Sequence, residues 1–130
     1  MPRMIFVNLP VDDLDRATSF YRALGFEQHA DTSSDKAAAF VVSDTIWITL
    51  LTRPYFQEFI NGDIAATPAT TEVTIGLSAE TREEADDLRR RAREAGGSAW
   101  RGSFEEGSMY VAGFLDPDGH VWEIVHAPDA

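Results

Sequence analysis

The sequence contains no cysteine among its 130 residues. Disulfide bonds, thiolate metal sites and a cysteine nucleophile are therefore excluded. The chain also lacks an apolar run long enough to cross a bilayer, and no small-residue cleavage site of a signal peptide follows its first residues. We therefore expect a cytoplasmic protein that has no membrane partner.

Basic residues are scarce as well. Lysine and arginine number 11 against 22 aspartates and glutamates, so the formal net charge is −11. A chain of this charge repels a phosphate backbone, and nucleic acid is not expected as a partner. Solubility explains the charge most simply, and attraction of a cationic ligand is the alternative. Phosphate-binding loops, nucleotide fingerprints and a Ser-His-Asp arrangement are also missing.

The hydrophobic content of 44% in 130 residues is enough for one core and not for two independent domains. Two segments of the chain nevertheless repeat one order, which is a strand, a helix closed by glycine, and several strands with a tryptophan in the last one. The copies cover residues 1–60 and 72–130 approximately, and a linker rich in small residues joins them at about 61–71. The sequence thus predicts a single domain made of two repeated modules.

Local signals mark the helices of both modules. Asp12 or Asp13 can cap a first helix that ends at Gly25. Thr81 and Glu84 have the spacing of a capping box at the start of a second helix, and Gly96 and Gly97 end that helix. Both predicted helices therefore begin and end at residues suited to those positions.

Three motifs carry a resemblance to a known family. They are the stretches at residues 8–14, 20–26 and 114–123, with the sequences NLPVDDL, FYRALGF and FLDPDGHVWE. Together with the repeat, they resemble the vicinal oxygen chelate superfamily, also called the glyoxalase, bleomycin resistance and extradiol dioxygenase superfamily. The resemblance implies an α+β fold in which two βαβββ modules form an incomplete barrel around a cavity. It also implies a homodimer, and many members hold a divalent metal that chelates vicinal oxygens of a substrate.

The resemblance places the family's four metal-ligand positions on Phe6, Ile48, Thr74 and Glu123. Only Glu123 is a competent ligand, because phenylalanine and isoleucine have no donor atoms and a neutral threonine hydroxyl is a poor one. We therefore expect a member that lacks most metal-ligand residues and binds neither a metal nor another cofactor.

Other side chains offer little to restore a metal site. The histidines are expected either at the surface (His29, His120) or on the strand face opposite Glu123 (His126). Glu72 lies two residues before Thr74 and would share its face. A Glu72 and Glu123 pair could bind a metal weakly or raise the pKa of one carboxyl to make an acid or base, and a solvated strand end is the alternative for Glu72.

Strand alternation predicts which side chains line the cavity. The predicted ligand-binding set is Phe6, Asn8, Ile48, Glu72, Thr74 and Glu123. Trp47 and Trp122 fall on the opposite face, where they should pack under the helices. Tyr55, Phe56 and Phe59 form either a lid over the cavity mouth or an ordinary packed connector.

A mostly apolar cavity with a few polar groups is typical of small-molecule binding. The sequence therefore predicts a metal-independent small-molecule-binding protein without catalytic residues, which sequesters a cationic or aromatic compound. The alternative is a metal-dependent glyoxalase-like lyase, isomerase or dioxygenase. A cofactor-free enzyme that uses Glu123 as general base also stays open.

Overall fold

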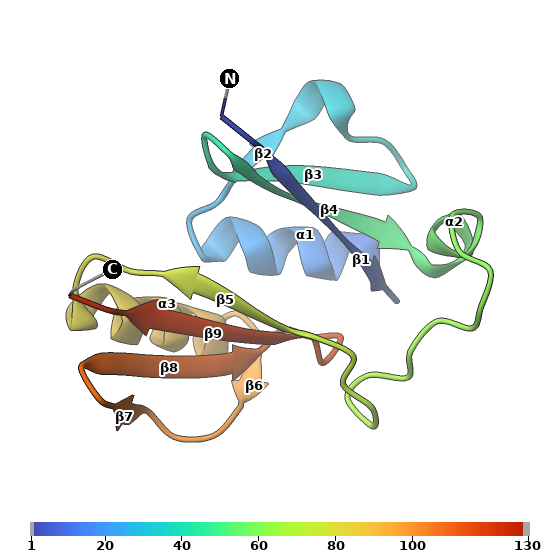
Figure 1. Cartoon of the computed structure of the whole chain (residues 1–130). Helices are drawn as coiled ribbons and strands as arrows, with labels where there is room; N and C mark the ends of the chain where they lie inside the picture. The colour runs from blue at the N-terminus through green and yellow to red at the C-terminus, as the bar shows by residue number, and fades with distance from the viewer. Residues whose placement is uncertain (1, 129–130) are drawn as a thin grey trace. The chain divides into compact units, whose positions relative to one another are not determined.

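The structure is a computed structural model that describes residues 2–128. The chain divides into two compact units, Met1–Ala65 and Ala66–Ala130, called unit 1 and unit 2. This division falls inside the stretch where the sequence predicts a linker. Each unit contains one open sheet and a helix in the order βαβββ, with one extra short strand in unit 2, so the predicted α+β fold of two βαβββ modules is confirmed (Figure 1).

Unit 1 is a four-stranded sheet with two helices. Its elements are β1 (Ile5–Val11), α1 (Leu14–Ala23), β2 (Glu27–His29), a 3-10 turn (Ala30–Thr32), β3 (Ala37–Ser43), β4 (Ile46–Thr52) and α2 (Arg53–Gln57). The strand order is β1-β4-β3-β2, in which β1 is parallel to β4 and the other pairs are antiparallel. The strand β1 is therefore at the edge of this sheet.

The helix α1 covers one face of the unit 1 sheet and forms its core. The Asp13 carboxylate accepts a hydrogen bond from the backbone N–H of Arg16 at 3.0 Å, so Asp13 caps the helix. Gly25 ends it with φ at 98°, a backbone conformation that glycine adopts without strain. The buried Tyr21 ring lies 6.1 Å from the Phe40 ring of β3, centroid to centroid. The apolar core of unit 1 thus lies between α1 and the sheet.

Unit 2 repeats this plan around a longer helix. Its elements are β5 (Thr74–Ser78), α3 (Arg82–Glu94), β6 (Ser98–Ala99), β7 (Phe104–Glu106), β8 (Met109–Leu115) and β9 (Val121–His126). The strand order is β5-β9-β8-β6, and β7 pairs with β8 as well. Trp122 is 1% exposed and stacks on Phe114 with ring centroids 6.5 Å apart. The prediction that Trp122 belongs to the core is confirmed.

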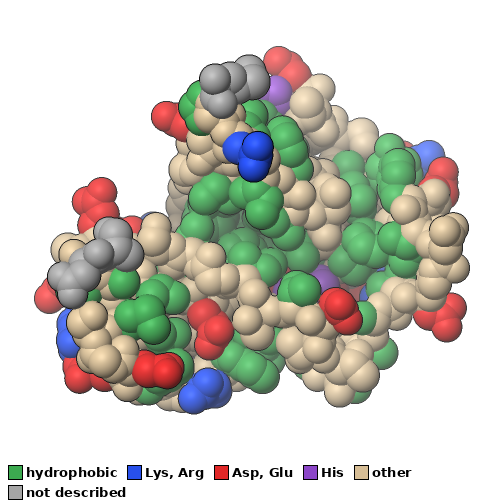
Figure 2. Space-filling view, viewed as in Figure 1, with side chains coloured by type: hydrophobic (Ala, Val, Ile, Leu, Met, Phe, Trp, Pro, Cys, Tyr) green, Lys and Arg blue, Asp and Glu red, His purple; other side chains and the backbone are tan. Residues whose placement is uncertain are grey.

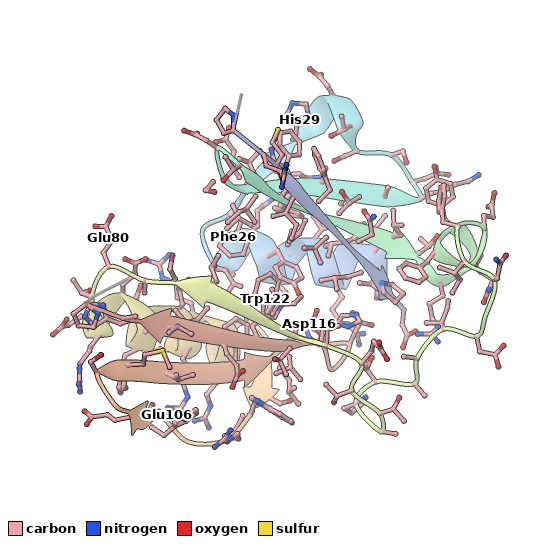
Figure 3. The ribbon with its side chains drawn as sticks, viewed as in Figure 1. Phe26, His29, Glu80, Glu106, Asp116 and Trp122 are labelled. Carbon is pink, nitrogen blue, oxygen red and sulfur yellow. The ribbon has the colours of Figure 1, made fainter. Side chains whose placement is uncertain are left out.

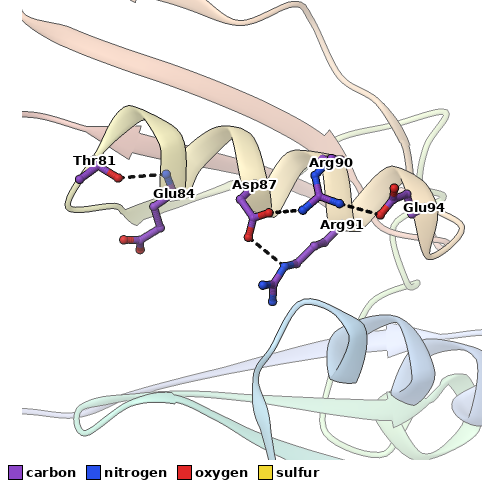
Figure 4. A network of polar contacts seen from close by, with 6 residues as sticks. All are labelled: Thr81, Glu84, Asp87, Arg90, Arg91 and Glu94. Atoms are coloured by element: carbon purple, nitrogen blue, oxygen red, sulfur yellow. Dashed lines mark hydrogen bonds and ion pairs between the residues drawn. The ribbon is translucent and has the colours of Figure 1, made fainter.

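The exposed face of α3 carries a network of charged side chains (Figure 4). The hydroxyl of Thr81 accepts a hydrogen bond from the backbone N–H of Glu84 at 3.0 Å, as the capping box predicts. Further along, Arg90 forms ion pairs with Asp87 and Glu94. The hydrogen bond to Asp87 and the charges of both carboxylates raise the pKa of Arg90 above its usual value. The helix α3 has 13 residues, and no helix within residues 2–128 qualifies as a membrane span.

A tight turn joins β8 to β9. The carboxylate of Asp116, which is 2% exposed, accepts hydrogen bonds from the backbone N–H groups of Asp118 and His120, both at 2.9 Å. Gly119 has φ at 85°, and a Cβ atom added to it would lie only 2.8 Å from the Cβ atom of Pro68. The turn therefore needs glycine at position 119 for two reasons, its backbone conformation and the close approach of Pro68.

Candidate functional site

The register of the strands decides which side chains share a face of the unit 1 sheet. Residues that are directly paired across neighbouring strands point to the same side. In the β1–β4 pair, Phe6 is next to Trp47 and Asn8 is next to Thr49. These four side chains lie on the face away from α1, which we call the outer face. The Phe6 and Trp47 rings indeed lie together, with centroids 6.3 Å apart.

Ile48 lies on the other face. It pairs with Phe40 of β3 and is only 1% exposed, so it belongs to the core under α1. The expectation that Ile48 shares a face with Phe6 is wrong, and so is the expectation that Trp47 packs under the helix. Trp47 and Trp122 are not equivalent in the repeat, and an alignment that matches them is shifted by one residue.

The strand register within each unit corrects this alignment. Asn8 pairs with Thr49 in unit 1, as Gly76 pairs with Glu123 in unit 2. Asn8 follows Phe6 by two residues, as Gly76 follows Thr74. Thr49 is therefore the counterpart of Glu123 in the repeat. In the same way Ile48 is the counterpart of the buried Trp122.

In unit 2, Thr74 and Glu123 share the sheet face that is opposite Trp122, as the sequence predicts. Thr74 pairs with Val121. Val121 lies two residues before Glu123 in β9, so the side chains of all three residues point to one face. Glu72 is exposed and precedes β5, so strand alternation does not extend to it. The sequence did not indicate that Trp100 packs closely against Gly113. A Cβ atom added to Gly113 would lie 2.9 Å from the Cδ1 atom of Trp100.

A groove with a volume of about 600 Å³ is formed by residues of unit 1. The open sides of three strands supply one part of its lining, and the 3-10 turn and the segment around α2 supply the rest. The lining residues are Asn8, Thr32, Ala37, Thr49, Leu51, Tyr55, Phe56, Phe59 and Ile60. Figure 1 shows α2 directly after β4, next to the end of β1. Tyr55 and Phe56 of this helix line the groove.

Aromatic side chains form the α2 part of the groove. The rings of Tyr55 and Phe59 meet edge to face, with centroids 5.0 Å apart and an interplanar angle of 84°. Phe59 is 66% exposed, and hydrophobic side chains are also visible at the surface around α2 in the space-filling view (Figure 2). Phe56 lines the groove too. All three aromatic residues that the sequence offered as a lid or a connector are therefore part of the groove lining.

The polar groups of the groove are neutral. They are the amide of Asn8, the hydroxyls of Thr32 and Thr49, and the phenol of Tyr55. No aspartate, glutamate, histidine, lysine or arginine is among the lining residues in the described part of the chain. The cation Lys36 lies close to one lining residue, with its Nζ atom 5.7 Å from the centre of the Tyr55 ring.

His29, at the end of β2 (Figure 3), is half-buried rather than fully solvated as expected, and it contacts the lining residue Thr32. Its Nδ1 atom is 2.9 Å from the Thr32 hydroxyl, and its ring centre is 4.9 Å from that of Trp47. His120 is half-buried in the turn after β8. His126 contacts the carbonyl oxygen of Ala79 through Nδ1 at 3.1 Å, on the face away from Glu123 as predicted.

The four side chains at the family's ligand positions do not suit a divalent metal. With the corrected register these positions are Phe6, Thr49, Thr74 and Glu123. A phenyl ring, two neutral hydroxyls and one carboxylate offer a single strong donor, whereas catalytic metal sites use three or more imidazole or carboxylate ligands. Within residues 2–128, no three histidine, cysteine, aspartate or glutamate side chains gather into a possible metal site.

Comparison with known proteins agrees with this architecture. Residues 3–124 match the model of the Glyoxalase/Bleomycin resistance protein/Dioxygenase superfamily. A solved structure of the hypothetical protein SA1046 from S. aureus is similar, with 29% sequence identity, a TM-score of 0.81, and coverage of 97% of this chain and 94% of that chain. No curated protein matches the sequence significantly.

Two further solved structures are similar in fold alone, given their low sequence identity. A glyoxalase-related enzyme from Fulvimarina pelagi has 19% identity, a TM-score of 0.82, and coverage of 98% of this chain and 90% of that chain. The fosfomycin resistance protein FosX from Mesorhizobium loti has 15% identity, a TM-score of 0.70, and coverage of 97% and 92%.

Proposed function

The chain belongs to the glyoxalase/bleomycin resistance protein/dioxygenase superfamily, and we propose that it binds a small molecule in the groove of unit 1 without a metal ion. The observation that carries the proposal is the groove itself. Its volume of about 600 Å³ falls in the range of small-molecule sites, and its lining is mostly apolar with a few polar groups. Such a lining binds a ligand by burying apolar surface and uses the polar groups to orient it.

The metal-dependent alternative has less support from the residues present. A lyase, isomerase or dioxygenase of this family that uses a metal needs several donors, and three of the four ligand positions carry Phe6, Thr49 and Thr74. The enzymes among the structural neighbours share the fold at low sequence identity, which does not extend their chemistry to this chain. Binding without chemistry is therefore the function that the groove supports best.

A ligand screen on chelator-dialysed protein tests this proposal. Thermal-shift measurements with a library of neutral and charged aromatic and aliphatic compounds should identify ligands that stabilise the folded state. Phe59→Ala should weaken these ligands about tenfold, because it removes an exposed aromatic wall of the groove at little structural cost. Phe104→Ala removes a half-buried aromatic ring in unit 2 and is the control for the loss of a phenyl ring away from the groove.

Binding that survives dialysis against a chelator and depends on Phe59 but not on Phe104 supports the proposal. Ligands that bind only after addition of a divalent metal would contradict it. Equal loss in both variants would also contradict it, because a site elsewhere or a general loss of stability would then explain the result.

A further inference from the structure

The charges around the unit 1 groove limit the chemistry of its ligand. None of the lining residues in the described part of the chain is ionisable near neutral pH, and the cations close to α2 have other contacts. Lys36 lies over the Tyr55 ring, and Arg53 pairs with Asp12 with its Nε atom 3.5 Å from the carboxylate. A charged ligand would lose hydration in this groove and gain no opposite charge among the lining residues, which is unfavourable. The groove therefore favours a ligand without charge.

The shape of the lining favours a flat ligand. Ala37 and Leu51 are paired in the β3–β4 register, point to the same face and give the groove a low apolar floor on the sheet. The rings of Tyr55, Phe56 and Phe59 line the groove as well. Aromatic side chains contact aromatic ligands through offset-stacked or edge-to-face arrangements, and such contacts add to the gain from buried area. A planar aromatic ring suits this lining.

Two polar side chains lie together on the strand wall. Asn8 and Thr49 are paired in the β1–β4 register and point to the same face, on strands about 4.8 Å apart. The amide of Asn8 and the hydroxyl of Thr49 each donate and accept hydrogen bonds. A single neutral group on the ligand, such as a hydroxyl or an amide, can therefore bond to both side chains.

We propose that the groove binds uncharged, planar aromatic molecules that carry one hydrogen-bonding group directed at Asn8 and Thr49. This inference rests on the proposed function and narrows it to one ligand class. It differs from the expectation drawn from the net charge, which favoured a cationic compound.

Three naphthalene derivatives of equal size test the inference. They are 2-naphthylmethanol, which is neutral, 2-naphthylmethylammonium, which is a cation, and 2-naphthoate, which is an anion. Each is titrated into ¹⁵N-labelled protein, and amide chemical shifts give both the dissociation constant and the location of binding. We expect the neutral compound to bind at least tenfold more tightly than either ion and to shift amides of residues 49–60.

Substitutions at position 49 test the polar contact. Thr49→Val keeps the shape of the side chain and removes the hydroxyl, so it should weaken 2-naphthylmethanol by about three- to tenfold. Thr49→Ser keeps a hydroxyl and should retain most of the affinity. Thr52→Val is the matched control, because Thr52 is on the same strand and on the opposite face.

Tighter binding of either ion at residues 49–60 would overturn the inference and leave the proposed small-molecule function standing. Equal affinity of wild type and Thr49→Val would overturn the assigned polar contact. If none of the three compounds binds, the aromatic ligand class is wrong. The wider screen with chelator-dialysed protein then decides the proposed function separately.

Discussion

Ile48 and Thr49 are neighbours in β4 whose side chains serve opposite faces of the sheet. Ile48 is 1% exposed under α1, whereas Thr49 lines the groove. We expect Ile48→Ala to lower the free energy of unfolding by about 2–5 kcal/mol, the range for truncating a buried aliphatic residue. Thr49→Ala should cost less than about 1 kcal/mol. Urea denaturation of both variants measures the difference, and similar losses would contradict the register described above.

Gly119 is a position where the addition of one Cβ atom should lower the stability of the fold. Its φ of 85° disfavours a side chain, and a Cβ atom there would lie 2.8 Å from both Cβ and the backbone nitrogen of Pro68. Gly119→Ala should therefore lower the free energy of unfolding by more than about 1 kcal/mol. Gly102 has no atom within 4 Å of an added Cβ. Gly102→Ala should change stability by less than about 1 kcal/mol and is the control in the same urea experiment. Equal effects of the two substitutions would contradict this account.

The sequence predicted some residues of the site region better than others. Asn8 lines the groove on the face that alternation within β1 predicts. Thr74 and Glu123 are on different strands, and the family resemblance rather than alternation alone gave their shared face, which the β5–β9 pairing confirms. Ile48 was placed on the wrong face because the position of β4 relative to β1 depends on pairing between strands, which alternation within one strand cannot give. Trp100 directly follows the two-residue strand β6, which is too short to show a periodic pattern. Whether any of the predicted residues binds a ligand stays a prediction.

At the scale of elements, α3 depends on its N-terminal cap. The Thr81 hydroxyl accepts the Glu84 backbone N–H at 3.0 Å, and the Glu84 carboxylate accepts the backbone N–H of Glu80 at 3.3 Å. Thr81→Ala should lower the free energy of unfolding by about 0.5–2 kcal/mol, whereas Thr81→Ser should preserve it. Chemical denaturation followed by circular dichroism measures both. A loss of the same size in Thr81→Ser would show that the hydroxyl does not carry the effect.

The helices of the fold could be predicted because their ends are local. Asp13 and Thr81 cap α1 and α3 through side-chain bonds to backbone groups three residues away, so the signal lies within a few residues. The five-residue helix α2 gave no such signal. It begins at Arg53 and has Pro54 in its first turn, and its Thr52 N-cap makes no side-chain bond. Its place on the groove depends on packing against β1 and β4, which the sequence alone does not specify.

At the scale of the whole molecule, the ligand positions of the family predict the metal content. Phe6, Thr49 and Thr74 replace donors, so we expect protein dialysed after purification to contain no stoichiometric nickel, zinc, iron or manganese. Elemental analysis by mass spectrometry measures the content per chain. One equivalent of such a metal that disappears in Glu123→Ala would contradict the expectation, whereas a residual metal that persists in Glu123→Ala does not involve this carboxylate.

The two-unit architecture could be predicted because both copies repeat the same local signals in the same order. The groove could not be predicted in this way. Alternation places the strand residues of its lining on one face, but it does not show that the aromatic residues in and after α2 pack beside them. The net charge of −11 suggested a cationic ligand, yet no charged side chain in the described chain lines the groove. A charge summed over the whole chain describes its surface field and does not specify the chemistry of one site.

The surface of β1 bears on the oligomeric state. Met4, Ile5 and Phe6 are 41%, 54% and 59% exposed, and they lie at the start of an edge strand. Adjoining exposed hydrophobic side chains of this size are typical of a protein interface. Together with the family resemblance, this patch leads us to expect a homodimer. Light scattering should give a mass of twice the 14.4 kDa of one chain at micromolar concentration.

A charge in this patch tests whether it forms the interface. Phe6→Glu should shift the protein to a monomer, because an unpaired carboxylate would have to be buried between two chains. Val73 is 57% exposed in unit 2, and Val73→Glu is the matched control that should leave the mass unchanged. A monomeric wild type would contradict the expected homodimer. A dimer that persists in Phe6→Glu and dissociates in Val73→Glu would instead place the interface at the start of β5.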